Sequence, residues 1–124
     1  MRWSKIKQRA ESFLCEKFQG RLQIYLTSYD KFHRDEGRGW ITFDGNEIYQ
    51  AAGQDRRQQF YETIVGYPNV DVGEALRSED PLLRLLAVCD RRVGRTRLEK
   101  IAAGKTGGPI LMLVEERLKK DSNP

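Results

Sequence analysis

The dipeptide Asp44-Gly45 constrains the fold more than any other feature of this sequence. It lies between the runs Trp40–Phe43 and Asn46–Tyr49, which are rich in aromatic and β-branched residues. Asp-Gly favours the positive φ angles of a type I′ turn, which joins two antiparallel strands. Upstream, apolar and more polar residues alternate over residues 22–27, as in a half-buried strand. The sequence therefore predicts a three-stranded antiparallel meander.

Helical spacing appears on both sides of this sheet. Apolar residues recur every three or four positions from Trp3 to Phe18, which predicts one amphipathic helix ending before Gly20. Helical spacing returns after Gly53 and continues to residue 118, with turn residues dividing it into four or five short helices. The predicted fold class is α+β: an N-terminal helix, the meander, then a C-terminal cluster of short helices.

Three of these C-terminal helices carry start signals. Asp71 with Glu74 and Thr96 with Glu99 have the spacing of a capping box. Asp80-Pro81 is typical of a first helical turn, because Asp caps free N–H groups and Pro fits the first helical position. The helix after Pro81 is apolar nearly all round over residues 82–88, so we expect it to be the most buried helix.

Length and composition fit one compact domain over residues 1–124, since the chain has 124 residues of which 39% are apolar. We expect residues 1–52 to form the helix and sheet, residues 54–120 the helical part, and residues 121–124 to fray. Cys15 and Cys89 are too few for a disulfide scaffold or a four-ligand zinc site and are expected to be reduced core thiols. Neither a metal nor another cofactor is expected.

The longest dense apolar run, residues 110–114, is far shorter than the ~20 residues of a membrane span, and no secretory signal pattern is present. We therefore expect a cytoplasmic protein that does not contact membranes. No pattern indicates its oligomeric state.

Positive charge is concentrated near the C-terminus. Residues 91–124 carry 9 basic and 4 acidic side chains, whereas residues 1–90 carry 13 basic and 14 acidic ones. The candidate binding residues are Arg91, Arg92, Arg95, Arg97 and Lys100. Guanidinium groups beside a helix start suit phosphates or a partner's carboxylates. The structural alternative is that Asp90 pairs with Arg91 or Arg95 and that arginine stems cover apolar surface.

Trp40 is the sixth candidate binding residue. With Tyr25, Tyr29 and Tyr49 on or beside neighbouring strands, it could stack single-stranded bases, although packing within the fold is the favoured interpretation. His33 is the lone histidine, lies beside Asp35 and Glu36, and is interpreted as a solvated loop residue. No convergent catalytic set is visible, so we do not expect an enzyme.

Three motifs resemble a family of small bacterial cytoplasmic proteins without an established activity. They are the start at residues 2–7 (RWSKIK), the strand start at residues 37–40 (GRGW) and the helix junction at residues 85–98 (LLAVCDRRVGRTRL). The resemblance implies a bacterial, cytoplasmic setting and supplies no mechanism.

Two functions fit these observations. The first is a protein-interaction module, regulatory or immunity-like, that binds an acidic protein surface through its basic C-terminal helices. The second is weak, salt-sensitive nucleic-acid binding through the same arginine cluster.

Overall fold

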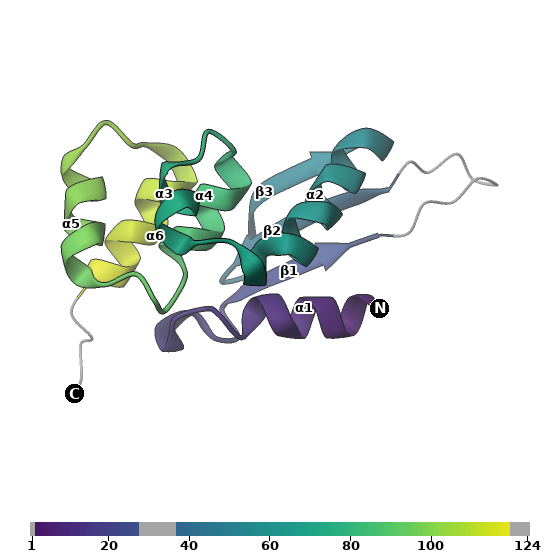
Figure 1. The fold of residues 1–124 in the computed structure, drawn as a ribbon, viewed down its shortest axis with the longest axis horizontal. Coiled ribbons are helices and arrows are strands. Elements are labelled where there is room, and N and C mark those ends of the chain that lie inside the picture. The colour runs from purple at the N-terminus through teal and green to yellow at the C-terminus, as the bar shows by residue number, and fades with distance from the viewer. Residues whose placement is uncertain (1, 28–36, 120–124) are drawn as a thin grey trace.

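The computed structural model describes residues 2–27 and 37–119. Figure 1 shows a sheet and the helices that cover it toward one end of the molecule, and a helical cluster at the other end. The elements are α1 (Trp3–Glu11), the 3-10 turn η1 (Glu16–Phe18), β1 (Leu22–Leu26), β2 (Arg38–Phe43), β3 (Asn46–Ala52), α2 (Gln54–Gly66), the 3-10 turn η2 (Tyr67–Asn69), α3 (Val72–Arg77), α4 (Pro81–Val88), α5 (Arg95–Ala103) and α6 (Gly108–Leu118). The predicted α+β fold class and element order are confirmed.

The sheet is the predicted antiparallel meander, with strand order β1-β2-β3. Asp44 and Gly45 have φ angles of 52° and 83°, as a type I′ turn requires. The register shifts between Ile41 and Thr42, where β2 faces β3. On the other side of β2, Trp40 lies directly opposite Tyr25 of β1.

Helix α2 covers one face of this sheet, and α1 runs along the β1 edge (Figure 1). The close approach of α2 depends on Gly39, because a Cβ atom at that position would lie 2.2 Å from the Phe60 ring. The Phe60 ring also stacks on Tyr49 at a centroid distance of 6.2 Å. Glycine is therefore needed at residue 39 for helix and sheet to meet.

The C-terminal helices form a cluster around α4. Five of the eight α4 residues are buried, as the apolar pattern predicts. Two predicted caps are also confirmed: the Asp71 carboxylate accepts from the Glu74 backbone N–H at 3.0 Å, and Asp80 accepts from that of Leu82 at 2.9 Å.

Two predicted helix boundaries are wrong. The first helix ends at Glu11 because the chain then pairs with the segment after α4: Leu14 bridges Asp90, and the Cys15 N–H donates to the Cys89 carbonyl at 2.8 Å. This tertiary pairing replaces the helical hydrogen bonds that the apolar spacing favoured.

The capping box predicted at Thr96 does not form either. Helix α5 begins two residues earlier than this box predicts, with Gly94 at the N-cap, and Glu99 pairs with Arg95 at 2.8 Å. Glu99 thus faces the first turn of its own helix as an i,i+4 ion-pair partner.

Buried side chains from α1, the sheet and α2 to α6 join in one hydrophobic core. None of the helices in the described ranges is long and apolar enough to cross a membrane.

Candidate protein-binding groove

The first two arginines of the predicted cluster make contacts within the chain. Arg91 donates to the Ser12 carbonyl at 2.8 Å, and its guanidinium lies 5.6 Å from the centre of the Phe13 ring. The Arg92 guanidinium lies over the same ring at 4.8 Å. Both side chains therefore fasten the turn after α4 to the end of α1.

Arg92 also neutralises a fully buried acid. The Nε and Nη2 atoms of Arg92 donate to the two carboxylate oxygens of Asp90 at 3.0 and 2.7 Å, and its backbone N–H donates at 2.8 Å. The predicted pairing of Asp90 with Arg91 or Arg95 is thus wrong. Arg92 lies two residues after Asp90, and the turn between them lets its guanidinium reach both carboxylate oxygens of Asp90.

Tyr67 completes this buried cluster by donating its hydroxyl to Asp90 at 2.6 Å. Burial acts to raise the pKa of Asp90, but the hydrogen bonds from Arg92 and Tyr67 outweigh it and hold that pKa below its usual range. Burial, together with the hydrogen bond to Asp90, raises the pKa of the Tyr67 hydroxyl. The cluster is a charged anchor of the fold.

The later basic residues of the cluster lie on α5 and have different surroundings. Arg95 forms an exposed ion pair with Glu99. Arg97 and Lys100 are exposed, and neither forms an ion pair with any residue that the structure describes. These two cations are available to a partner.

Arg97 and Lys100 line a groove of about 270 Å³ between α3 and α5. We call it the α3–α5 groove; its lining residues are Gly73, Leu76, Arg77, Arg97, Lys100 and Ile101. Leu76 and Ile101 are partly buried and pack on the core, so they form an apolar floor. Arg77 is exposed and, within the described ranges, has no ion-pair partner either. The groove combines this floor with three cations and no acidic lining residue.

Arg77 could not be assigned to this site from the sequence, because it lies on α3, well before the basic C-terminal segment. Its position in the last turn of a predicted helix, next to Leu76, is the signal that the sequence offers. Nothing in the sequence places α3 beside α5.

Trp40 lies on the sheet, away from α5, which occupies the opposite end of the molecule (Figure 1). Its ring stacks on that of Tyr25 at 5.0 Å, Arg38 lies over Trp40 at 4.2 Å, and Lys7 lies over Tyr25 at 4.9 Å. Arg38 is fixed in turn by an ion pair with Glu47 at 2.8 Å. Both rings thus have aromatic and cationic partners within the chain, which favours cross-strand packing over base stacking.

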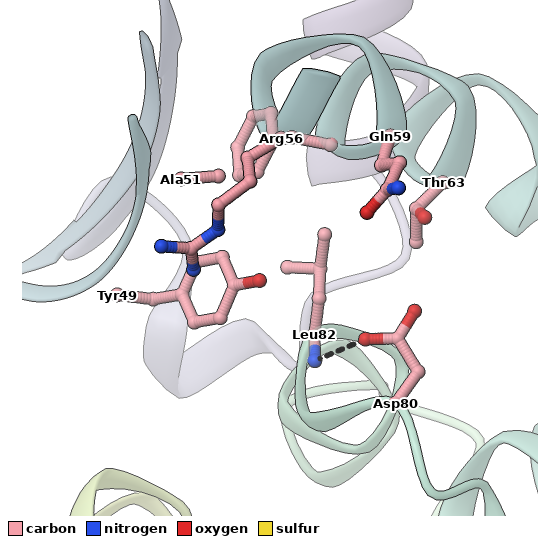
Figure 2. A pocket seen from close by; sticks show the side chains of 8 residues that line it. Tyr49, Ala51, Arg56, Gln59, Thr63, Asp80 and Leu82 are labelled. Carbon is pink, nitrogen blue, oxygen red and sulfur yellow. Dashed lines mark hydrogen bonds between the residues drawn. The ribbon is translucent and has the colours of Figure 1, made fainter. Parts of the chain in front are cut away.

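A smaller polar hollow lies between β3, α2 and α4, where Arg56 extends over Tyr49 (Figure 2). Its volume is about 50 Å³, room for roughly one or two water molecules. Figure 2 shows that Asp80, on its rim, is engaged as the cap of α4 through Leu82. Burial raises the pKa of the Tyr49 hydroxyl, which therefore stays protonated near neutral pH. The hollow is too small for an organic substrate.

The remaining candidates are the two cysteines, His33 and Tyr29. Cys15 and Cys89 are buried free thiols, as predicted, and burial raises the pKa of Cys89. His33 and Tyr29 lie outside the described residues. Among the residues that are described, no three His, Cys, Asp or Glu side chains are grouped as a metal site would need.

One comparison with known proteins gives a result. The model of the SF0329 protein family matches residues 2–62 and residues 50–114. The chain belongs to this family. The matched ranges include all three motifs that carry the resemblance, and they extend over the strands and the α3–α5 groove of this SF0329 family member. No curated protein and no solved structure matches the chain.

Proposed function

We propose that this protein is a non-enzymatic interaction module that binds an acidic segment of a partner protein in the α3–α5 groove. One observation carries the proposal: Arg77, Arg97 and Lys100 surround the apolar floor formed by Leu76 and Ile101 without ion-pair partners among the described residues. A surface that combines unpaired cations with an apolar floor matches an apolar side chain flanked by carboxylates.

The apolar contact supplies most of the affinity on this proposal. Exposed ion pairs contribute only about 0.2–1 kcal/mol each. Burying a leucine-sized side chain contributes about 1.5–3 kcal/mol. The cations would therefore select an acidic partner and speed its approach, while the floor formed by Leu76 and Ile101 would hold it.

We place this activity in the bacterial cytoplasm. The two buried free thiols suit a reducing compartment, because disulfides form mainly in oxidising ones.

A peptide titration tests the proposal. The probe is a fluorescein-labelled peptide of glutamates with single leucines between them, followed by fluorescence anisotropy at low salt. The double substitution Arg97→Glu with Lys100→Glu should weaken binding by at least about tenfold. The matched control, Arg2→Glu with Lys5→Glu, makes the same charge change at two exposed residues at the start of α1 and should leave binding nearly unchanged.

A second peptide, with serine in place of each leucine, separates the two parts of the groove. We expect it to bind clearly more weakly than the leucine peptide, because it cannot fill the apolar floor. Equal binding of both peptides, or equal losses in both double variants, would show that the probe senses net charge and would refute the proposal.

Nucleic-acid binding through the arginine cluster is the second candidate, and it is supported by the 9 basic and 4 acidic residues of the segment 91–124. Arg91 and Arg92 are engaged within the chain, which leaves few free phosphate ligands. A single-stranded oligonucleotide in the same titration tests it. This candidate would be favoured if the logarithm of the association constant falls with the logarithm of the salt concentration at a slope of about −0.7 per contacted phosphate.

A further inference from the structure

A second sizeable hollow lies where α4 and α6 meet β3, and it shares no lining residue with the α3–α5 groove. Its volume is about 240 Å³, and Ile48, Leu85 and Ile110 are among the apolar residues that line it. An apolar cavity of about 150 Å³ can accept benzene. This hollow, which we call the β3–α4–α6 pocket, therefore has room for a ring with a short chain.

Arg84 is the charged residue that lines the β3–α4–α6 pocket. Its Nε atom is buried without a hydrogen-bond partner, and its guanidinium makes no ion pair with any described residue. Buried donors without an acceptor are rare in folded proteins, so this N–H is a candidate to donate to a bound group. No acidic residue lines the pocket to supply the missing acceptor.

The start of α6 adds a second source of positive potential. Helix α6 has Gly107 at its N-cap, no side-chain cap and no acid in its first turn. A Cβ atom at Gly107 or Gly108 would meet nothing within 4 Å, so the backbone there is open to an approaching group. Pro109 has no N–H, so the donors of this turn are the N–H groups of residues such as Gly108 and Ile110, and with the helix dipole they favour an anion at this end.

We propose that the β3–α4–α6 pocket binds a small amphipathic carboxylate. The carboxylate would lie between Arg84 and the first turn of α6, and the apolar body would contact Ile48, Leu85 and Ile110. A neutral molecule of the same shape fills the pocket but leaves Arg84 without a charged acceptor, so it binds more weakly. The proposal is independent of peptide binding in the α3–α5 groove.

The experiment compares 3-phenylpropionate with its neutral amide, 3-phenylpropanamide, which has the same shape. Each is titrated into the ¹⁵N-labelled protein up to about 10 mM, because ligands of this size bind in the millimolar range. We expect the carboxylate to bind at least about tenfold more tightly than the amide. The carboxylate should cause its largest chemical-shift changes at the backbone N–H groups of Ile48, Leu85, Gly108 and Ile110.

Two substitutions locate the interaction. Arg84→Met keeps an apolar stem and removes the charge, and should reduce the preference for the carboxylate to less than about threefold. Arg77→Met removes the same charge from the α3–α5 groove and should leave the preference intact. If Arg84→Met does not fold, Ile110→Phe provides the test, because it fills the pocket, keeps Arg84 and should abolish binding of both probes.

Three results would overturn the proposal. The carboxylate and the amide could bind equally well, the shifts could map to the α3–α5 groove, or the wild-type protein could bind neither probe up to about 10 mM. The first and third results do not concern binding of an acidic peptide to Arg97 and Lys100, and the second would favour it, so failure here is distinguishable from failure of the proposed function.

Discussion

Replacing Asp90 with alanine should destabilise the fold strongly, although the residue belongs to the charged junction that first suggested a binding site. Asp90 is fully buried and accepts four hydrogen bonds, one from Tyr67 and three from Arg92. These bonds connect η2 to the turn after α4. Alanine removes all four and supplies no acceptor in their place.

The loss of stability depends on whether Tyr67 and Arg92 can be hydrated once Asp90 is removed. The Tyr67 side chain is 2% exposed, so its hydroxyl loses its acceptor where water has little access, at a cost of about 1–3 kcal/mol. Removing one partner of a fully buried ion pair costs about 3–5 kcal/mol. Arg92 is 36% exposed and recovers part of its hydration. We therefore expect the free energy of unfolding to fall by about 3 kcal/mol.

Urea unfolding at pH 7, followed by circular dichroism, measures this change. Tyr67→Phe should cost only about 1 kcal/mol, because Arg92 still neutralises Asp90. Combined with Asp90→Ala it should cost less than the sum of the two, since no hydroxyl is then left unpaired. A loss below about 1 kcal/mol for Asp90→Ala, or strict additivity of the two changes, would refute the reasoning.

Three further outcomes are expected. Because the pKa of Asp90 is lowered in the folded state, its contribution to the free energy of unfolding is present above about pH 4 and is lost as the pH falls through the lowered pKa. In Asp90→Asn, the free energy of unfolding should therefore fall less steeply with decreasing pH, as measured by urea titrations across that range. Gly39→Ala should lower the free energy of unfolding by about 2 kcal/mol or more in thermal unfolding, because the added methyl group collides with the Phe60 ring. Adding Phe60→Leu to this variant should recover part of the loss. The Cys89 thiol should react with a chromogenic disulfide reagent only after urea unfolding, because it is fully buried with a raised pKa; rapid reaction in native buffer would contradict its placement.

Local patterns predicted three of the turns and caps, although the capping box at Thr96 does not form. The Asp44-Gly45 turn and the caps at Asp71 and Asp80 depend on residues within a few positions of one another, and all three form. The end of α1 could not be predicted, because the bridge between Leu14 and Asp90 that replaces the helix depends on the tertiary fold.

The site was predicted only in part, for the same reason. Sequence spacing identified a basic junction. It could not distinguish Arg92, which is held by a buried acid, from Arg97, which lines the groove and has no ion-pair partner in the part of the chain that the structure describes. That difference depends on how the chain turns after α4. Arg77 joins the groove only because the tertiary fold brings α3 to line the same groove as α5.

Retention of partners from a bacterial lysate tests the central claim most directly. The immobilised protein is compared with the Arg97→Glu, Lys100→Glu variant and with the Arg2→Glu, Lys5→Glu control, at low salt, with and without nuclease. We predict that the wild type and the control retain one defined protein regardless of nuclease, and that the groove variant does not. Equal retention by the groove variant, or retention that disappears with nuclease, would contradict the claim that the α3–α5 groove binds an acidic protein.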